Sequence, residues 1–288
     1  MSPNNTNNIL ITGTPRSGTT LTCYLLNKLP DTVALHEPMK VKKFAELGSY
    51  EEISQTIECF CDEQRESILI RKRAISKNVN GIVPDNPVGT SRSHAGLRQN
   101  IAFKGEIVID KTVSPDFMLV VKHNFAFTAV LDGLVKDFPV YAIVRNPLAT
   151  LASWNSLGFD AQSVYAGVAE RLDPDLKEEL ISIRDDLDRQ IYLLDWFYKQ
   201  FRRYLPEQHI IRYESIVESG GKALSVVRSE AEDLNELMQG RNRSKLYDHQ
   251  SMFRIGDRLL KSDGAYWESY TRASVESLLN ELREAVRS

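Results

Sequence analysis

The most informative hydrophobic pattern in the chain is a short apolar run that meets a turn of small residues and then a helical repeat. Residues 9–11 (Ile-Leu-Ile) are apolar and predict a buried strand. Leu21, Leu25 and Leu26 recur at helical spacing and predict a helix. Between them, residues 13–20 (GTPRSGTT) predict a tight loop that enters the helix through small hydroxyl residues.

Further apolar runs have the length of short strands, and apolar residues at helical spacing separate most of them. The runs at 106–112 and 118–123 show the continuous apolar pattern of buried parallel strands. Strands that alternate with helices predict an α/β fold with a mostly parallel central sheet and helices on both faces. The expected strands are 32–38, 106–112, 118–123, 140–145 and 209–214, and the expected helices are 49–73, 127–138, 147–157, 187–201 and 275–282.

Residues 41–106 interrupt this alternation. They contain the expected helix at 49–73, and then residues 76–100 are polar and rich in Gly, Asn, Pro and Ser, which predicts a long loop or binding lid. A chain of 288 residues can bury one large core. We therefore expect a single α/β domain over residues 1–288, in which 41–106 are a helical and loop insertion.

Charged side chains stand at the ends of the expected strands. In an open α/β sheet, ligands bind beyond the carboxyl ends of the strands. This rule predicts that five charged residues converge on one edge of the sheet: Arg16, Glu37, Lys111, Lys122 and Arg145.

The loop at 13–20 is a candidate anion site. The free N–H groups at a helix N-terminus and the positive end of its dipole favour phosphate-like groups. The loop is close to the P-loop pattern G-x-x-x-x-G-K-[ST], but Thr19 stands where the Lys should be, and Arg16 supplies a cation from inside the loop. A strand–turn–helix junction that binds nothing is the alternative, but an Arg among these amides needs an anionic partner.

A second candidate anion site lies at mid-chain. Arg145 ends an expected strand, and Ser153 follows eight residues later in the next helix. Asn146 and Pro147 open that helix, so its N-terminus lies beside the arginine.

The bulk composition limits the partners. With 36 basic and 39 acidic residues the formal charge is −3, which excludes a general electrostatic attraction to nucleic acid or anionic membranes. The three cysteines read as free thiols in a reducing compartment, and no apolar run approaches the roughly 20 residues of a membrane span. The N-terminal residues lack the pattern of a signal peptide, and the histidines lack metal-ligand spacing. We expect a cytoplasmic protein without a metal site.

The two anion motifs together resemble the P-loop sulfotransferases. The segment 14–20 (TPRSGTT) is similar to their 5′-phosphosulfate loop, P-[KR]-S/G-G-T, and Arg145-Asn146-Pro147 with Ser153 is similar to their 3′-phosphate motif at the same spacing. The similarity extends from Asn8 to about Val217. It implies a P-loop three-layer sandwich that uses 3′-phosphoadenosine 5′-phosphosulfate (PAPS) as co-substrate and releases 3′-phosphoadenosine 5′-phosphate (PAP).

The resemblance also implies roles for individual residues. Glu37 falls where carbohydrate-type members carry a catalytic Glu, Lys111 matches the Lys of their E-K-[ST] segment, and Tyr213 matches a Tyr near the adenine. By the same resemblance, the donor is bound by residues Pro15, Arg16, Ser17, Gly18, Thr19, Thr20, Arg145, Ser153 and Tyr213.

Three positions depart from the pattern. Val113 stands where the cytosolic phenol and steroid enzymes carry a catalytic His, which favours Glu37 as the base and the carbohydrate or bacterial type as the nearer relative. Leu21 replaces a Trp that often stacks on adenine in the cytosolic branch. The late R-K-G loop is here 260–262 (LKS), from which Lys261 is expected to reach the 3′ phosphate.

The sequence thus predicts an enzyme that transfers a sulfuryl group from PAPS to a hydroxyl or amine of a small-molecule or sugar-like acceptor. Arg16 stabilises the leaving phosphate, Glu37 takes the acceptor proton, and Lys111 or Lys122 holds the bridging oxygen. His36 is the weaker base candidate, because strand alternation points it away from Glu37. Residues 41–106 and about 155–185 are expected to select the acceptor.

Two other functions remain open at this point. An ATP-dependent P-loop kinase of small molecules is one, because residues 106–110 (EIVID) resemble a Walker B strand that would place Mg²⁺ beside Thr20. A non-catalytic nucleotide-binding module is the other. The sequence predicts neither the oligomeric state nor the identity of the acceptor.

Overall fold

The computed structural model describes residues 6–158 and 166–287. Its centre is a five-stranded sheet in the order β2-β7-β1-β8-β9, and every pair of neighbours is parallel. This confirms the expected mostly parallel α/β fold. The strands are β1 (Asn8–Gly13), β2 (Thr32–His36), β7 (Met118–Lys122), β8 (Val140–Val144) and β9 (Ile210–Arg212).

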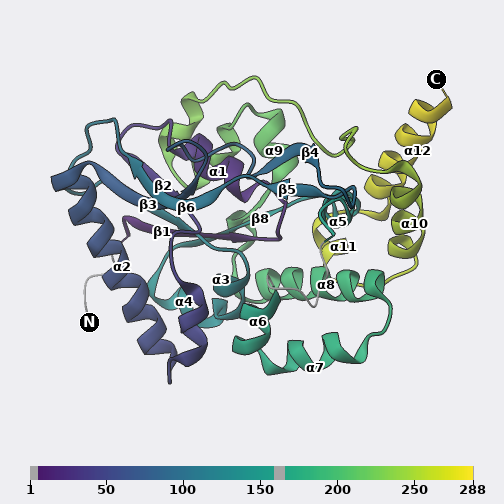
Figure 1. Ribbon diagram of the computed structural model, residues 1–288, viewed down its shortest axis with the longest axis horizontal. Coiled ribbons are helices and arrows are strands. Elements are labelled where there is room, and N and C mark those ends of the chain that lie inside the picture. Colours follow the sequence, from purple (N-terminus) through teal and green to yellow (C-terminus); the bar gives the residue numbers. More distant parts are fainter. Residues whose placement is uncertain (1–5, 159–165, 288) are drawn as a thin grey trace.

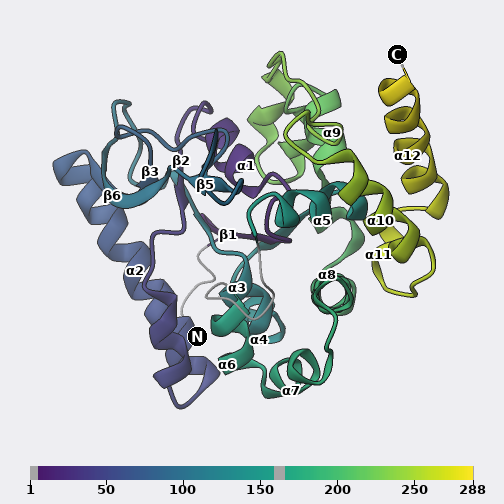
Figure 2. The same cartoon turned by 45° about the vertical axis from the view of Figure 1, so that its right-hand side comes forward.

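Every residue of β1, β2, β7 and β8 is buried, as expected of strands covered on both faces. Helices α1 (Thr19–Leu26) and α9 (Tyr213–Glu218) lie on one side of the sheet, and α3 (Phe125–Ala129), α4 (Leu131–Asp137) and α8 (Asp186–Tyr204) lie on the other (Figures 1 and 2). The sheet edge at which the strands end therefore lies between two helical layers.

The helix that follows β8 begins at a side-chain cap. Asn146 caps α5 (Pro147–Asn155): its side chain accepts hydrogen bonds from the amides of Leu148 and Ala149, and Pro147 occupies the first turn. Expected helix 127–138 is instead the two short helices α3 and α4. The other helices are α2 (Tyr50–Arg71), α6 (Ala166–Leu172), α7 (Pro174–Ser182), α10 (His249–Leu260), α11 (Tyr266–Ser269) and α12 (Arg272–Arg287), with 3₁₀ turns at Val41–Glu46, Glu207–His209, Lys222–Val226 and Ser229–Asp233.

The prediction of a buried parallel strand over 106–112 is wrong. The strand there is β6 (Phe103–Val108), which pairs antiparallel with β3 (Arg73–Asn78) outside the central sheet. Within β6, Ile107 is buried whereas Phe103 and Val108 are exposed. A short apolar run does not by itself distinguish a central strand from one strand of a half-exposed ribbon.

The predicted loop at 76–100 also contains more order than expected. It includes the end of β3 and a second antiparallel pair, β4 (Val88–Arg92) with β5 (Arg98–Asn100). These strands are mostly polar and half-exposed, so they lack the apolar signal of a core strand. Both ribbons belong to the insertion. The β3–β6 ribbon lies beside β2, whereas the β4–β5 ribbon lies near α5 (Figure 1), where the amide of Arg98 donates to the carbonyl of Ser156 (2.9 Å).

Two properties of the described residues concern membranes and metals. Within the described part of the chain, no helix combines the length and the apolar character needed to cross a lipid bilayer. Among residues 6–158 and 166–287, no group of three or more His, Cys, Asp or Glu side chains could hold a metal ion. The expectations about the first five residues, and the part of the acceptor segment at 159–165, lie outside the described residues.

Candidate active site

The carboxyl ends of the central strands border a cavity of about 490 Å³. Its wall combines the loop after β1, the ends of β2 and β7, the insertion, and a segment near residue 240 that comes from the C-terminal third of the chain. The cavity therefore lies where the rule for open α/β sheets places a ligand.

The loop after β1 turns at Gly18, which precedes α1 and has φ 95°. A Cβ atom at this position would lie 2.7 Å from Cδ2 of Tyr213, so both the backbone angle and the space require glycine. The first-turn residues Thr19, Thr20 and Leu21 line the cavity, and the amides of a first helical turn have no partner within the helix. Of the predicted loop residues, Pro15, Arg16, Gly18, Thr19 and Thr20 line the cavity.

Ser17 is the one predicted loop residue from Pro15 to Thr20 that does not line the cavity. Its hydroxyl donates a hydrogen bond to the carbonyl of Ile143 in β8 (2.6 Å), and the residue is fully buried. Its side chain therefore fixes the loop to the sheet, and any contact of Ser17 with an anion would be through the backbone.

Arg16 projects into the cavity without a carboxylate partner among the described residues. Its Nη2 donates to Oδ1 of Asn86 (2.8 Å), and its Nε donates to Oγ of Ser153 (3.3 Å). Burial lowers the pKa of Arg16 to about 10, and the neighbouring Arg98 and Arg145 act in the same direction. A guanidinium in such surroundings is stabilised by an anion.

Arg145 comes from the end of β8 and reaches the same loop. Its Nη1 donates to the backbone carbonyl of Arg16 (3.0 Å), and its Nε donates to Oδ1 of Asn242 (2.8 Å). The guanidinium lies 4.8 Å from the ring centre of Tyr213, which also lines the cavity. The two predicted anion motifs thus meet in one site, whereas Ser153 contributes through its contact with Arg16 and does not itself line the cavity.

At the other end of the cavity, two ammonium groups hold Glu37. Nζ of Lys122 lies 2.7 Å from Oε1, and Nζ of Lys77 lies 2.6 Å from Oε2. Burial by itself raises the pKa of Glu37, but Lys122 and the other positive neighbours outweigh it and hold the pKa well below its usual value. Glu37 is therefore a carboxylate with both oxygens engaged. Lys77 belongs to β3, and no sequence motif indicated it.

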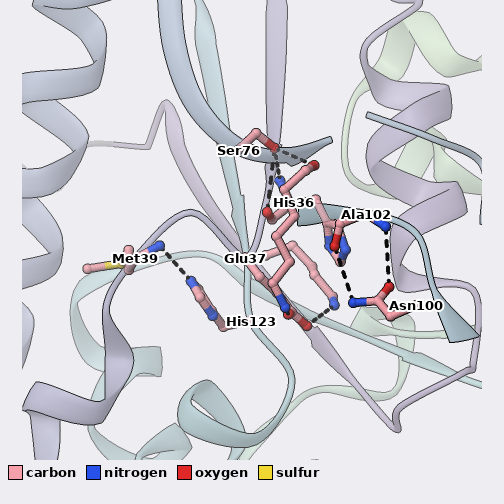
Figure 3. A network of polar contacts seen from close by, with 9 residues as sticks. His36, Glu37, Met39, Ser76, Asn100, Ala102 and His123 are labelled. Atoms are coloured by element: carbon pink, nitrogen blue, oxygen red, sulfur yellow. Dashed lines mark hydrogen bonds and ion pairs between the residues drawn. The ribbon is translucent and has the colours of Figure 1, made fainter. Parts of the chain in front are cut away.

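His36 lines the same cavity, contrary to the expectation from strand alternation. The reason is the backbone of Glu37, whose φ of 45° ends the extended geometry directly after β2. The amide of His36 donates to Oγ of Ser76 in β3 (2.9 Å), which fixes this end of β2 to the insertion (Figure 3).

The structure corrects the prediction for Lys111. Its Nζ donates to the carbonyls of Asn27 (2.9 Å) and Leu29 (3.0 Å) just after α1, and it does not line the cavity. The error follows from the misplaced strand at 106–112, which does not run in the central sheet. Four of the five expected charged strand ends converge, and Lys122 is the lysine that the fold brings to Glu37.

Lys261 is likewise placed elsewhere, in a separate cavity between α8 and α10 that Arg184 and Arg258 also line. The late cation of the main cavity is Arg241. Its amide donates to the hydroxyl of Tyr213 (3.1 Å), and its Nη2 pairs with Asp85 (2.7 Å). The run Arg241-Asn242-Arg243 could have been noticed as a late basic segment, but only the fold shows which cation faces the site.

The charge of the cavity is opposite to that of the chain. Six cationic side chains line it against two carboxylates, although the whole protein has a formal charge of −3. The insertion contributes two of these cations, Lys77 and Arg98, which the sequence analysis missed. The cations are Arg16, Lys77, Arg98, Lys122, Arg145 and Arg241, and the carboxylates are Glu37 and Asp85.

No protein-family model matches the sequence, and no curated protein matches it. Among solved structures, the chain is similar to the sulfotransferase STF9 from Mycobacterium avium, with 12% identity, a TM-score of 0.35, and coverage of 99% of this chain and 77% of that chain. It is also similar to the sulfotransferase STF1 from Mycobacterium tuberculosis H37Rv, with 13% identity, a TM-score of 0.34, and coverage of 88% and 76%. A likeness of this degree assigns no reaction to the chain, so the function has to come from the chemistry of the site.

Proposed function

We propose that the protein is a PAPS-dependent sulfotransferase that acts on a hydroxyl or amine of a small-molecule acceptor. The observation that supports this most directly is the junction of the two anion motifs, at the 3.0 Å hydrogen bond from Arg145 to the carbonyl of Arg16. PAPS carries a 5′ phosphosulfate and a 3′ phosphate, so it needs two adjoining anion sites within one cavity.

The residues present fit such a donor. The amides at the start of α1, with Arg16, would hold the 5′ phosphosulfate, and Arg145 with Arg241 would hold the 3′ phosphate. Ser153 would act from behind Arg16, and the ring of Tyr213 lies beside Arg145 where the nucleoside would pass. The excess of cations over carboxylates in the wall matches a polyanionic ligand.

In the proposed reaction, a bond forms between the acceptor oxygen or nitrogen and sulfur while the bond from sulfur to the oxygen of the 5′ phosphate breaks. Arg16 and the loop amides stabilise the charge that develops on the departing phosphate. We assign the donor to the bridging oxygen to Lys122, because this residue lines the cavity at the end of β7 and Lys111 does not. Glu37 as the proton acceptor stays a prediction from the sequence.

The kinase alternative loses its support. It depended on a Walker B strand at 106–110 beside the P-loop, but β6 pairs with β3 outside the central sheet. The non-catalytic alternative does not account for the paired Glu37 and Lys122 beside an anion cradle. A sulfotransferase uses both halves of the cavity.

The acceptor is proposed to enter from the side of the insertion, in keeping with the expectation for 41–106. This segment supplies Lys77, Asn86, Arg98 and Asn100 to the cavity wall. No nucleic-acid or membrane partner is part of the proposal, and the co-product is PAP.

Ligand-dependent melting tests the proposal. PAP at a concentration well above its dissociation constant should raise Tm, and Mg·ATP at the same concentration should not. Labelled PAPS should then lose its sulfuryl group, to water or to a hydroxylated acceptor. A protein that melts at the same temperature with and without PAP would contradict the proposal, and stabilisation by Mg·ATP alone would favour the kinase.

A further inference from the structure

The imidazole of His36 is a buried reactive group that has no structural task. The side chain is 3% exposed, lines the main cavity, and has no hydrogen bond from either ring nitrogen to any described residue. Its Nδ1 is buried and unpartnered. A buried polar atom without a partner costs free energy, so the fold leaves a proton-binding position of this ring unused.

His123 shows the contrast, although it lies one strand away. Its Nε2 accepts a hydrogen bond from the amide of Met39 (3.1 Å; Figure 3). Its ring packs edge-on against Phe127. It does not line the cavity. His123 therefore stabilises the fold through its ring nitrogen, whereas the ring nitrogens of His36 make no hydrogen bond to the described residues.

The carboxylates of the cavity wall are already engaged. Both oxygens of Glu37 accept from ammonium groups, and Asp85 pairs with Arg241. Of the described side chains in the wall that can take a proton near neutral pH, His36 alone is uncharged and without a hydrogen bond. Its position next to Glu37 places it at the same end of the cavity as Lys122.

We infer that His36, and not Glu37, is the catalytic base that accepts the proton of the acceptor. This inference rests on the proposed sulfotransferase function. As the acceptor oxygen bonds to sulfur, its proton passes to a ring nitrogen of His36, and the electron pair of the breaking sulfur–oxygen bond stays on the 5′ phosphate. The imidazolium then returns its proton to solvent. Glu37 is a positioning residue that holds Lys77 and Lys122.

Because of the surrounding charges, the pKa of His36 should depend on whether the donor is bound. His36 faces Lys122 and His123 from β7, Lys77 from β3, and the adjacent Glu37. Burial and Lys122 keep the pKa of His36 well below 6.5 in the absence of ligand, so the ring is neutral. The negative charge of a bound phosphosulfate would offset the lysines and stabilise the imidazolium.

Two measurements on the full-length protein test the inference. The first is the pH dependence of PAPS hydrolysis, with water as the acceptor, in the wild type and in the His36→Gln, Glu37→Gln and His94→Gln variants. We expect His36→Gln to lower the rate by about 10²–10⁴-fold and to remove the acidic limb of the profile. Glu37→Gln should lower the rate but keep that limb, and the exposed His94→Gln should change neither.

The second measurement needs no turnover. The ¹⁵N chemical shifts of the His36 ring should report a neutral imidazole in the free protein at pH 6 and proton uptake when PAP binds. An unchanged ring, or an acidic limb that Glu37→Gln removes and His36→Gln keeps, would overturn the assignment while PAP binding still supports a sulfotransferase. Failure of PAP to bind the wild type would instead refute the proposed function and this inference with it.

Discussion

Arg145 donates a hydrogen bond from its Nη1 to the backbone carbonyl of Arg16 at 3.0 Å, although the two residues belong to motifs 129 positions apart. The contact joins the loop after β1 to the end of β8, its neighbour in the sheet. Because a guanidinium has more donors than this contact uses, Arg145 can fix the loop and still bind an anion. One residue thus shapes both halves of the proposed donor site.

Arg145→Gln should weaken the binding of PAP by about 10- to 150-fold, the effect of losing charge-assisted hydrogen bonds worth about 1.5–3 kcal/mol. Adenosine 5′-phosphosulfate lacks the 3′ phosphate, so its affinity should change much less. Isothermal titration calorimetry with both nucleotides measures the difference. Arg212→Gln, at the exposed last residue of β9, is the control. Equal losses for both nucleotides would show that Arg145 does not recognise the 3′ phosphate.

Substitution of Lys122 and substitution of Lys111 should have different effects on turnover and stability. Lys122→Gln should abolish PAPS turnover, because it removes the ammonium group beside Glu37 at the end of β7. Lys111→Gln should leave turnover nearly unchanged and lower the free energy of unfolding by about 1–2 kcal/mol, because two carbonyls after α1 lose a donor. Rates of PAP release and urea denaturation give the two quantities. Loss of activity in Lys111→Gln without loss of stability would restore the prediction from the sequence.

Gly18→Ala should remove the stabilisation by PAP, because the new Cβ would meet the ring of Tyr213 at 2.7 Å and displace the loop. Gly96→Ala is matched for backbone strain, since Gly96 also has a positive φ (75°) but open space around it. That control should cost only about 1 kcal/mol and keep the PAP-induced rise in Tm. Similar behaviour of the two variants would mean that the contact with Tyr213 does not shape the donor site.

Arg241 and Lys261 test which late cation serves the donor. Arg241→Gln should weaken PAP binding about tenfold or more, because the residue lines the donor cavity and its amide contacts Tyr213. Lys261→Gln should leave the dissociation constant unchanged, since Lys261 lines a different cavity. If a titration with PAP shows weaker binding for Lys261→Gln and unchanged binding for Arg241→Gln, Lys261 is the late cation that binds the donor.

Stability should fall as the solution is acidified from pH 7 to 5.5. Burial keeps the pKa of His36 well below 6.5 and lowers that of His123 to about 3. Below about pH 6.5 these two histidines are therefore protonated in the unfolded chain but still neutral in the folded protein. The loss should approach about 1.4 kcal/mol per pH unit for each histidine. Urea denaturation at several pH values measures this slope, and His123→Gln should reduce it by about half. A flat profile would show that both rings titrate in the folded protein as they do in the unfolded chain.

Much of the site could be predicted because its chemistry is local. The loop at 13–20 contains its own turn, its own cation and the start of its own helix, and Asn146-Pro147 starts the helix beside Arg145. The placement of Lys111 failed because a short apolar run, here residues 107–109, is compatible with either a central strand or a ribbon. His36 ranked below Glu37 as a base candidate because strand alternation was expected to continue, whereas one positive φ, at Glu37, ends it.

By itself, the sequence determined the parallel α/β core and the two anion motifs, since buried strands, turn glycines and helix caps depend on residues close together in the chain. The tertiary structure alone decided which distant side chains share the cavity: Lys77 from the β3 ribbon, Arg98 from β5, and Arg241 from the C-terminal third. It also placed Lys122, and not Lys111, beside Glu37, and it placed His36 in the wall of the cavity. Such contacts depend on how the two ribbons and the segment near residue 240 pack around the sheet edge, and no local pattern of residues specifies that packing.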